Sequence, residues 1–311
     1  MELIRDFKNL TKNDVHLAGG KGASLGEMTL ANLPVPEGFV ILSTSFDRFL
    51  KEANIYEDID ADLHAVDTDK VHTVEKASEK IQATIMSAEM PEDIKQEILK
   101  FFKKLDSKFV AVRSSATSED SADAAWAGQL DTFLNTTKEH LLENVKKCWA
   151  SLFTSRAIFY RYEKNLHNTN ISVAVVVQKM IESEISGIAF SVHPVTQDHN
   201  QMIIEAGFGL GEAIVSGQIT PDSYVVEKEP VLIIDINVSD QKRGIFKKLP
   251  EGNEWKEING EKQKLTKEQI LELAKVIIKI EKHYKLPQDI EWAVEKNKFY
   301  ITQSRPITTL N

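Results

Sequence analysis

The sequence predicts a mixed fold of helices and short strands, of the α+β class, in a chain of 311 residues that can form two domains or one two-lobed unit. Residues 44 to about 105 carry apolar side chains at helical spacing, whereas residues 224 to about 258 are typical of several short strands. The glycine-rich segment 207–212 is followed by too little chain for a helical crossover to a parallel strand. These three observations favour a mixed fold without a dinucleotide-type crossover.

Composition and charge exclude several classes of protein. Hydrophobic residues make up 42% of the chain and charged residues 27%, which is typical of a soluble protein with a buried core. A formal charge of −9 argues against a nucleic-acid surface, which needs a basic footprint, but leaves room for a nucleotide site with a few local cations. Cys148 is the single cysteine, so we expect no intramolecular disulfide and a reducing, cytoplasmic location. The charged N-terminus predicts no signal peptide, and no stretch approaches the ~20 apolar residues of a membrane span.

The first candidate binding element is a glycine-rich segment near the N-terminus. Glycines at positions 19, 20 and 22 surround Lys21, and residues 23–30 can continue as a helix. Backbone amides at a helix start, together with one lysine, are suited to binding an anion. The spacing differs from that of a Walker P-loop. The alternative is a glycine-rich turn with an exposed lysine.

A second element follows an apolar strand at residues 109–113. The strand is expected to end at Arg113, and a run of small polar residues leads from there to Gly128. Such a loop can fold over a polyphosphate while the arginine at its base neutralises charge. The alternative is a long surface loop with an acidic tip. In the helical region that follows, residues 140–165, Cys148 lies on an apolar stripe and is expected in the core.

The middle of the chain supplies a candidate adenine pocket. The hydrophobic strand that begins at Val173 breaks into the polar–apolar segment 178–182, where backbone groups can read a base and Met180 can pack on its ring. Glu205 ends another buried strand and is a candidate metal or ribose contact. The following segment resembles a dinucleotide fingerprint, but Glu212 stands where the third glycine belongs, so we reject that interpretation.

The last part of the chain is the most informative. A helix begins with a capping box at Thr266 and ends before a strand that carries Asp289 and Glu291 two residues apart, on one side of the pleat. An antiparallel return strand brings Gln303 and Arg305 back beside them. Two carboxylates, an amide and a guanidinium can hold a divalent cation and face a phosphate. A solvated hairpin with a surface ion pair is the alternative.

Together these elements resemble the nucleotide-binding domain shared by phosphoenolpyruvate synthase, pyruvate phosphate dikinase and rifampicin phosphotransferase, over nearly the whole chain. The resemblance implies an ATP-grasp fold, in which two α+β lobes clamp ATP, and we expect the lobes at residues 1–177 and 178–311. Five ordered motifs carry it: residues 19–28, 112–115, 127–132, 207–212, and 289–292 with 303–306.

The resemblance also implies a role for each candidate residue, with ATP and Mg²⁺ as the ligands. The phosphates are expected to contact Lys21, Arg113, Gln303 and Arg305, with Lys21, Arg113 and Arg305 acting in catalysis. The remaining nucleotide contacts are expected from the loop residues Gly128, Gln129 and Thr132, and from the adenine segment Gln178, Lys179, Met180 and Glu182. The magnesium ligands are expected to be Glu291, Asp289 and Gln303.

Full-length members of this family add a domain with a phosphorylated histidine and a domain for the final acceptor. None of the eight histidines here lies in the expected Thr-Ser-His setting, so both domains are expected on another part of the protein or on a partner chain. The resemblance implies that the β-phosphoryl group of ATP passes to that histidine, leaving AMP and phosphate. Phosphoenolpyruvate synthase is our first hypothesis and rifampicin phosphotransferase the alternative. A non-catalytic nucleotide-binding regulatory protein is the hypothesis from another class.

Overall fold

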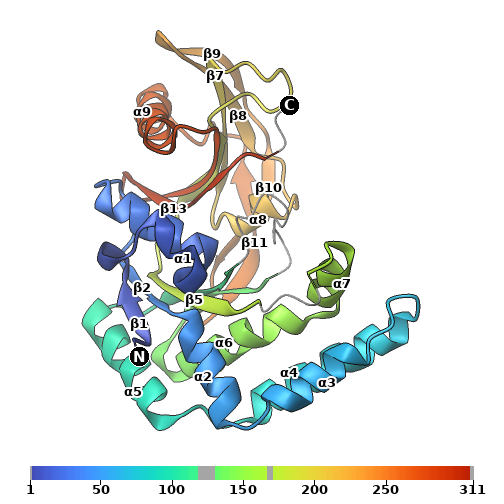
Figure 1. Ribbon diagram of the computed structural model, residues 1–311. Coiled ribbons are helices and arrows are strands. Elements are labelled where there is room, and N and C mark those ends of the chain that lie inside the picture. Colours follow the sequence, from blue (N-terminus) through green and yellow to red (C-terminus); the bar gives the residue numbers. More distant parts are fainter. Residues whose placement is uncertain (1, 118–129, 167–170, 309–311) are drawn as a thin grey trace. The chain divides into compact units, whose positions relative to one another are not determined.

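The computed structural model describes residues 2–117, 130–166 and 171–308. Its chain divides into two compact units (Figure 1). Unit 1 contains Met1–Glu27 and Glu37–Met180, and unit 2 contains Met28–Pro36 and Ile181–Asn311. The expected lobe boundary between residues 177 and 178 stays a prediction.

Unit 1 is built on an antiparallel sheet with the strand order β1-β2-β5-β3-β4. The central strand β5 is rich in valine, a β-branched residue that packs well on a pleated surface, and its first six residues are buried. The strands are β1 (Ile4–Asp6), β2 (Gly38–Ile41), β3 (Val110–Ala116), β4 (Thr132–Thr136) and β5 (Val173–Lys179).

Helices of unit 1 enclose an aromatic core. Phe49 stacks on Trp149 with ring centroids 5.0 Å apart, and Phe46 packs on the same indole. Cys148 is buried beside them, as expected, and burial raises the pKa of its thiol to about 12. The helices are α1 (Val15–Leu30), α2 (Ser43–Glu52), α3 (Tyr56–His64), α4 (Val71–Ser87), α5 (Glu92–Leu105), α6 (Lys138–Ala150) and α7 (Ser155–Glu163), with short 3₁₀ turns at Phe7–Asn9, Lys12–Asp14 and Ser151–Phe153.

Unit 2 is built on an antiparallel sheet with the order β13-β12-β6-β7-β8-β9, and β10 pairs with β11 in a separate two-stranded sheet. The long helix α9 lies beside the six-stranded sheet (Figure 1). The elements are β6 (Ile185–Phe190), β7 (Gln201–Phe208), α8 (Glu212–Val215), β8 (Asp222–Lys228), β9 (Val231–Asn237), β10 (Gln241–Lys247), β11 (Asn253–Gly260), α9 (Lys267–Tyr284), β12 (Gln288–Glu295) and β13 (Lys298–Pro306).

Local sequence signals explain how the chain enters and leaves the final hairpin. The predicted capping box is present, because the Thr266 hydroxyl accepts from the Gln269 N–H while the Gln269 side chain accepts from the Thr266 N–H. The polar turn between β12 and β13 places Lys296 and Asn297 at φ 50° and 60°. Two successive positive φ angles are those of a type I′ turn, whose twist matches the flanking strands.

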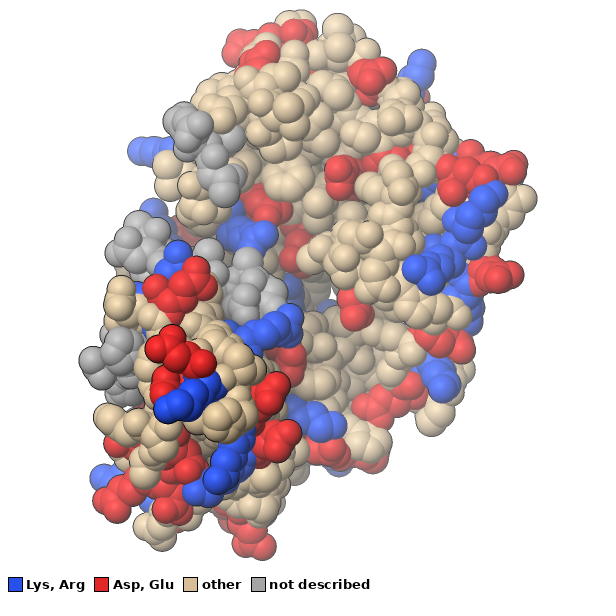
Figure 2. All heavy atoms as spheres, turned by 90° about the vertical axis from the view of Figure 1, so that its right-hand side faces the viewer, with Lys and Arg blue, Asp and Glu red and all other residues tan. Residues whose placement is uncertain are grey.

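Lys and Arg side chains are intermixed with Asp and Glu side chains on the face shown in Figure 2. Among the described residues, none of the helices combines the length and the apolar character needed to span a membrane.

Candidate functional site

The glycine-rich segment of unit 1 is held against the end of strand β3. Helix α1 is kinked at Gly19, whose backbone has φ 67° and ψ 171°. A Cβ atom at this position would lie 2.2 Å from the Ser115 hydroxyl oxygen and 2.3 Å from the Ser115 carbonyl oxygen. Only glycine fits there. The expected helix over residues 23–30 is confirmed, since helical structure resumes after Gly19 and continues to Leu30; the helical turn that begins at Val15, before the kink, was not predicted.

Ser115 also contacts the helical turn that carries Lys21. The Gly22 N–H donates to the Ser115 hydroxyl at 3.3 Å, so the segment is tied to β3 on both sides of the lysine. Lys21 itself is partly exposed. The arrangement therefore fixes a lysine and neighbouring backbone amides close to one strand end, which is the geometry of a candidate anion site.

Arg113 lies in the middle of β3 rather than at its end, so this part of the prediction was wrong. The strand continues to Ala116 because Ala116 still pairs with Val173 of β5. The local sequence around β3 does not reveal this partner strand. Arg113 is 7% exposed and lies directly opposite Thr132 of β4. Arg113, expected at the phosphates, and Thr132, expected to contact the nucleotide, are thus neighbours on adjacent strands. Gly128 and Gln129, which were expected to cover the phosphates, lie outside the described residues.

The segment expected to bind adenine begins in β5 and passes from unit 1 to unit 2 after Met180. Gln178 is buried between β2 and β3. The N–H groups of Lys179 and Met180 donate to the carbonyl oxygens of Glu37 and Phe109 at 2.8 and 3.1 Å. These two amides are therefore engaged within unit 1.

Glu182 continues this segment in unit 2. The Glu182 N–H donates to the Glu295 side chain at 3.1 Å. Its carboxylate accepts from the ammonium group of Lys247 at 2.5 Å, which ties the segment to β10. The roles of all four predicted adenine contacts stay predictions.

The final hairpin brings together the four residues that the sequence predicted, with a β-bulge between Glu291 and Trp292. Asp289 lies opposite Arg305, and Glu291 lies opposite Gln303. The Arg305 guanidinium donates through Nε and Nη2 to Asp289 Oδ2 at 2.9 and 2.7 Å. The alternative of an ion pair on a hairpin is therefore present, but it occupies one oxygen of Asp289 and leaves the Glu291–Gln303 pair as a separate feature.

The Glu291–Gln303 pair belongs to a row that crosses the sheet. In this row Glu291 of β12 lies opposite Ile188 of β6, and Ile188 lies opposite Glu205 of β7. Directly opposed residues on neighbouring strands point to the same face, so Glu205 shares a face with Glu291 and Gln303. Two strand spacings separate Glu205 from Glu291, or ~10 Å between backbones. Partial burial raises the pKa of the Glu205 carboxyl group.

Alternation along β12 places this row on the face opposite α9. Gln288, Ile290 and Trp292 are buried on the α9 side, whereas Asp289 and Glu291 are only partly buried. The open face therefore presents oxygen donors, the ligand type that Mg²⁺ prefers. No group of three or more His, Cys, Asp or Glu side chains arranged for a metal occurs within residues 2–117, 130–166 and 171–308. The predicted magnesium ligands are two carboxylates and one amide, so they do not make a group of three such side chains.

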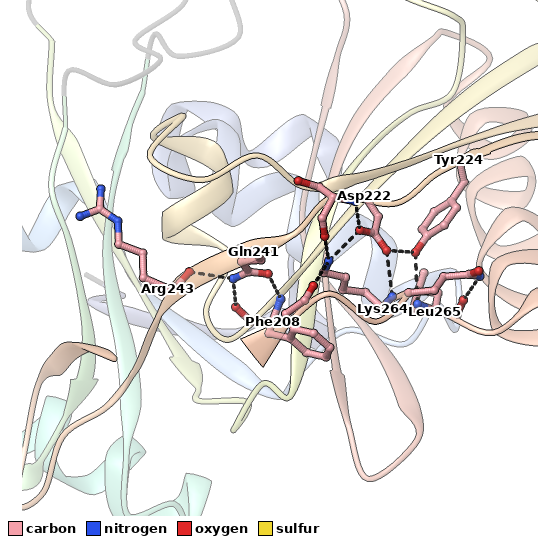
Figure 3. A network of polar contacts seen from close by, with 10 residues as sticks. Phe208, Asp222, Tyr224, Gln241, Arg243, Lys264 and Leu265 are labelled. Atoms are coloured by element: carbon pink, nitrogen blue, oxygen red, sulfur yellow. Dashed lines mark hydrogen bonds and ion pairs between the residues drawn. The ribbon is translucent and has the colours of Figure 1, made fainter. Parts of the chain in front are cut away.

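The rejected dinucleotide motif forms a tight turn held by side chains from β10. Strand β7 ends at Phe208, and α8 has only four residues, so no crossover helix follows. The Gln241 side chain accepts from the Phe208 N–H at 2.8 Å and donates to the Phe208 carbonyl oxygen at 2.9 Å (Figure 3). Gln241 thus pairs with the backbone of Phe208 as a neighbouring strand would.

Sequence reasoning missed a buried ion pair next to this turn. Asp222 of β8 and Lys264, two residues before the cap of α9, are both 0% exposed at their side chains, with Nζ 2.8 Å from Oδ1 (Figure 3). Lys264 Nζ also donates to the carbonyl oxygens of Ser239 and Gly260, which flank the β10–β11 hairpin. The lysine therefore closes the base of this hairpin. No local pattern signals a pairing across 42 residues.

Comparison with known proteins identifies the family. The family described as "Pyruvate phosphate dikinase, AMP/ATP-binding domain" matches residues 15–311. The chain is 43% identical to a probable phosphoenolpyruvate synthase of Methanocaldococcus jannaschii, covering 100% of this chain and 27% of that protein. It is 41% identical to a phosphoenolpyruvate synthase of Pyrococcus furiosus, covering 99% of this chain and 44% of that protein. It is 38% identical to a rifampicin phosphotransferase of Bacillus cereus, covering 99% of this chain and 36% of that protein.

The chain thus spans between 27% and 44% of the length of these three relatives. Among solved structures, D-alanine–D-alanine ligase from Helicobacter pylori aligns over 70% of this chain and 46% of its own, with 12% identity and a TM-score of 0.33, a likeness too weak to carry an argument. The family match is independent of that likeness and confirms the resemblance inferred from the five motifs. The fold combines helices with antiparallel sheets, as expected for the α+β class. The chain belongs to the pyruvate phosphate dikinase AMP/ATP-binding domain family.

Proposed function

We propose that this chain is the Mg-ATP-binding module of a dikinase-type phosphotransferase, which passes the β-phosphoryl group of ATP to a histidine on a separate domain or chain. The observation that carries this proposal is the row of oxygen donors on the open face of unit 2, with Glu291 opposite Gln303 and Asp289 paired to Arg305. In a chain of an AMP/ATP-binding family, such a row is suited to a metal-bound polyphosphate.

In unit 2 we propose different roles for the acidic and the basic side chains. Glu291 and Gln303 would hold Mg²⁺, with Asp289 in support, and the ion would neutralise phosphate charge when bound. Arg305 is oriented by Asp289, and its planar guanidinium is suited to donate to a phosphate oxygen. Glu205, on the same face, would contact the ribose or the metal.

In unit 1 the proposed role is electrostatic stabilisation of the phosphates. Lys21 stands between two glycines, and the segment around it is tied to Ser115, so its backbone surroundings are fixed before the nucleotide arrives. Arg113 is largely buried and therefore less screened by solvent than a surface arginine. We propose that both cations contact the phosphates, together with Thr132, Gly128 and Gln129, and that the segment 178–182 lines the adenine pocket.

The reaction requires two further parts. A histidine nitrogen would accept the β-phosphoryl group with AMP as the leaving group, one water would cleave the β–γ bond and release phosphate, and the group would then pass to a final acceptor. The chain covers less than half of the length of the three relatives, which is consistent with such parts on the rest of a longer protein or on a partner. We propose pyruvate as the acceptor, as in a phosphoenolpyruvate synthase. The identity of 43% to a probable phosphoenolpyruvate synthase, against 38% to a rifampicin phosphotransferase, favours this choice.

Calorimetric titration tests the nucleotide site. We expect ATP to bind more tightly than GTP, and to bind more tightly with magnesium than with EDTA. Absence of binding by ATP, AMP and GTP under both conditions would rule out the proposed module.

A second experiment separates phosphotransfer from a regulatory role. The longer protein, or this chain mixed with its histidine-bearing partner, is incubated with ATP labelled at the β-phosphorus. Acid-labile label on the partner histidine, together with AMP, supports phosphotransfer. Tight ATP binding with no AMP formed and no labelled histidine would instead indicate a regulatory nucleotide-binding protein.

A further inference from the structure

We call Asp289, Glu291, Gln303 and Glu205, the oxygen-bearing side chains on the open face of unit 2, the oxygen-donor row. A chain of hydrogen bonds lies behind it, on the α9 side of the sheet. Ser191 follows β6 and is 0% exposed. Its hydroxyl donates to Glu281 Oε1 of α9 at 3.0 Å and accepts from the Gln288 N–H at 2.8 Å. The Ser191 N–H in turn donates to the Gln288 carbonyl oxygen at 2.9 Å. Ser191 therefore holds both backbone polar groups of the first residue of β12.

Glu281 is itself held in place by Lys228, the last residue of β8. Lys228 Nζ lies 2.8 and 3.0 Å from the two carboxylate oxygens and donates to the Ser191 carbonyl oxygen at 2.9 Å. The two side chains are only 13% and 19% exposed, so this pair is less screened by solvent than a surface pair. The carboxylate that orients the Ser191 hydroxyl has a fixed position.

This arrangement bears directly on the row because Asp289 follows Gln288. Gln288 is also tied to β13, since the Ser304 hydroxyl donates to Gln288 Oε1 at 2.8 Å. Successive residues of a strand point to opposite faces, so rotation or sliding of Gln288 moves Asp289 and Glu291 on the other face. A displacement of about 1 Å at a site of this kind is enough to reduce function strongly.

We propose that Ser191 and Glu281 are positioning residues for the oxygen-donor row: they fix the start of β12, and through it Asp289 and Glu291, without touching the nucleotide or the metal. The inference rests on the proposed function of the row. It assigns a role to the contact between Ser191, just after β6, and Glu281 of α9, on the covered face of the sheet.

The test compares Ser191→Ala and Glu281→Gln with a matched control, Ser186→Ala. Ser186 lies on β6, the strand that Ser191 follows, is 2% exposed, and donates a buried hydrogen bond of 2.6 Å to the Gly209 carbonyl oxygen. Each variant of the whole chain is titrated with ATP in magnesium and in EDTA, and its thermal midpoint is measured. The readout is the ratio of the two affinities, because a loss of stability alone leaves this ratio unchanged in the folded protein.

We expect Ser191→Ala and Glu281→Gln to lower the magnesium-dependent gain in ATP affinity by about tenfold, as is typical when a group that orients metal ligands is removed. Ser186→Ala is expected to lower the thermal midpoint with the gain intact, and Ser191→Thr, which keeps the hydroxyl, to restore the gain. If Ser191→Ala does not fold, Glu281→Gln decides the test, because it keeps the size of the side chain.

Two results would count against different claims. An unchanged gain in Ser191→Ala and Glu281→Gln, with midpoints lowered as in the control, would reduce both residues to a purely structural role. A wild-type chain that gains no affinity from magnesium would instead overturn the proposed function of the row itself.

Discussion

The buried pair of Lys264 and Asp222 gives a sharp stability prediction, because both side chains are fully withdrawn from solvent. Lys264 Nζ uses its three donors on Asp222 and on the carbonyl oxygens of Ser239 and Gly260. Asp222 accepts from Nζ, from the N–H groups of Ser239 and Lys264, and from the Tyr224 hydroxyl. Every charged atom of the pair is therefore satisfied, and removal of either partner leaves an uncompensated charge.

The expected effect of Lys264→Met is a loss of about 3–5 kcal/mol in the free energy of unfolding. Asp222→Asn is expected to cost a similar amount. The double variant removes both charges, so its loss should be smaller than the sum of the two single losses, with a coupling energy of about 2 kcal/mol or more. With an m-value of roughly 2 kcal/mol/M, each single variant should move the urea midpoint of unit 2 by roughly 1.5–2.5 M.

Urea unfolding followed by circular dichroism and by tryptophan fluorescence measures these shifts, because Trp292, one of the four tryptophans, is buried in unit 2. Lys256→Met is the control: the Lys256 side chain is 51% exposed and pairs with a similarly exposed Glu254, so its midpoint should stay within error of the wild type. A loss below about 1 kcal/mol in Lys264→Met, or strict additivity in the double variant, would refute the reasoning from an uncompensated buried charge.

Three further predictions concern other residues. Glu291→Gln should weaken ATP binding about tenfold in magnesium and little in EDTA, because an amide is a poorer ligand for a hard cation; equal losses in titrations under both conditions would assign Glu291 to structure. Glu205→Gln should stabilise the free chain at pH 7 but weaken nucleotide binding. Burial raises the pKa of Glu205 above its ordinary value of 4.5, so wild-type stability falls relative to the variant as pH rises from about that value towards neutrality. Thermal melts from pH 4 to pH 7 test this sign. A difference between the thermal midpoints of variant and wild type that narrows as pH rises would contradict it. Cys148, whose thiol pKa is raised to about 12 by burial, should resist iodoacetamide at pH 8 until urea unfolds the chain, and rapid alkylation of the native protein would show an accessible thiol.

Features set by local sequence were predicted. The capping box at Thr266 and Gln269 and the β12–β13 hairpin follow from signals within about twenty residues. The two-residue turn alone would place Ser304 opposite Asp289. A β-bulge between Glu291 and Trp292 shifts the register by one residue and brings Arg305 to that position. The sequence alone therefore predicts which residues meet in this hairpin, but not the bulge that sets their register.

Features set by distant partners were not accessible in the same way. The length of β3, and with it the position of Arg113, depends on pairing with β5, some sixty residues away in the chain. The sequence indicates Glu205 as a candidate, but its place in one row with Glu291 depends on β6 lying between the two strands. The pairing of Lys264 with Asp222 has no local signature, since a lysine near a helix start is ordinarily solvated.

The distribution of charge explains why magnesium dependence is the property that best tests the proposed site. The open-face row of unit 2 presents the carboxylates of Asp289, Glu291 and Glu205, and carboxylates repel the phosphates of metal-free ATP. Asp289 is partly compensated by Arg305, which donates to its Oδ2 atom. Partial burial already disfavours the charged form of Glu205, so a further negative charge brought close to it without a cation is especially unfavourable. A bound divalent cation changes the interaction of these carboxylates with a polyphosphate from repulsive to attractive. Carboxylates in this arrangement discriminate against ATP without its metal, and neutral substitutions of them should reduce that discrimination by weakening the binding of ATP more in magnesium than in EDTA.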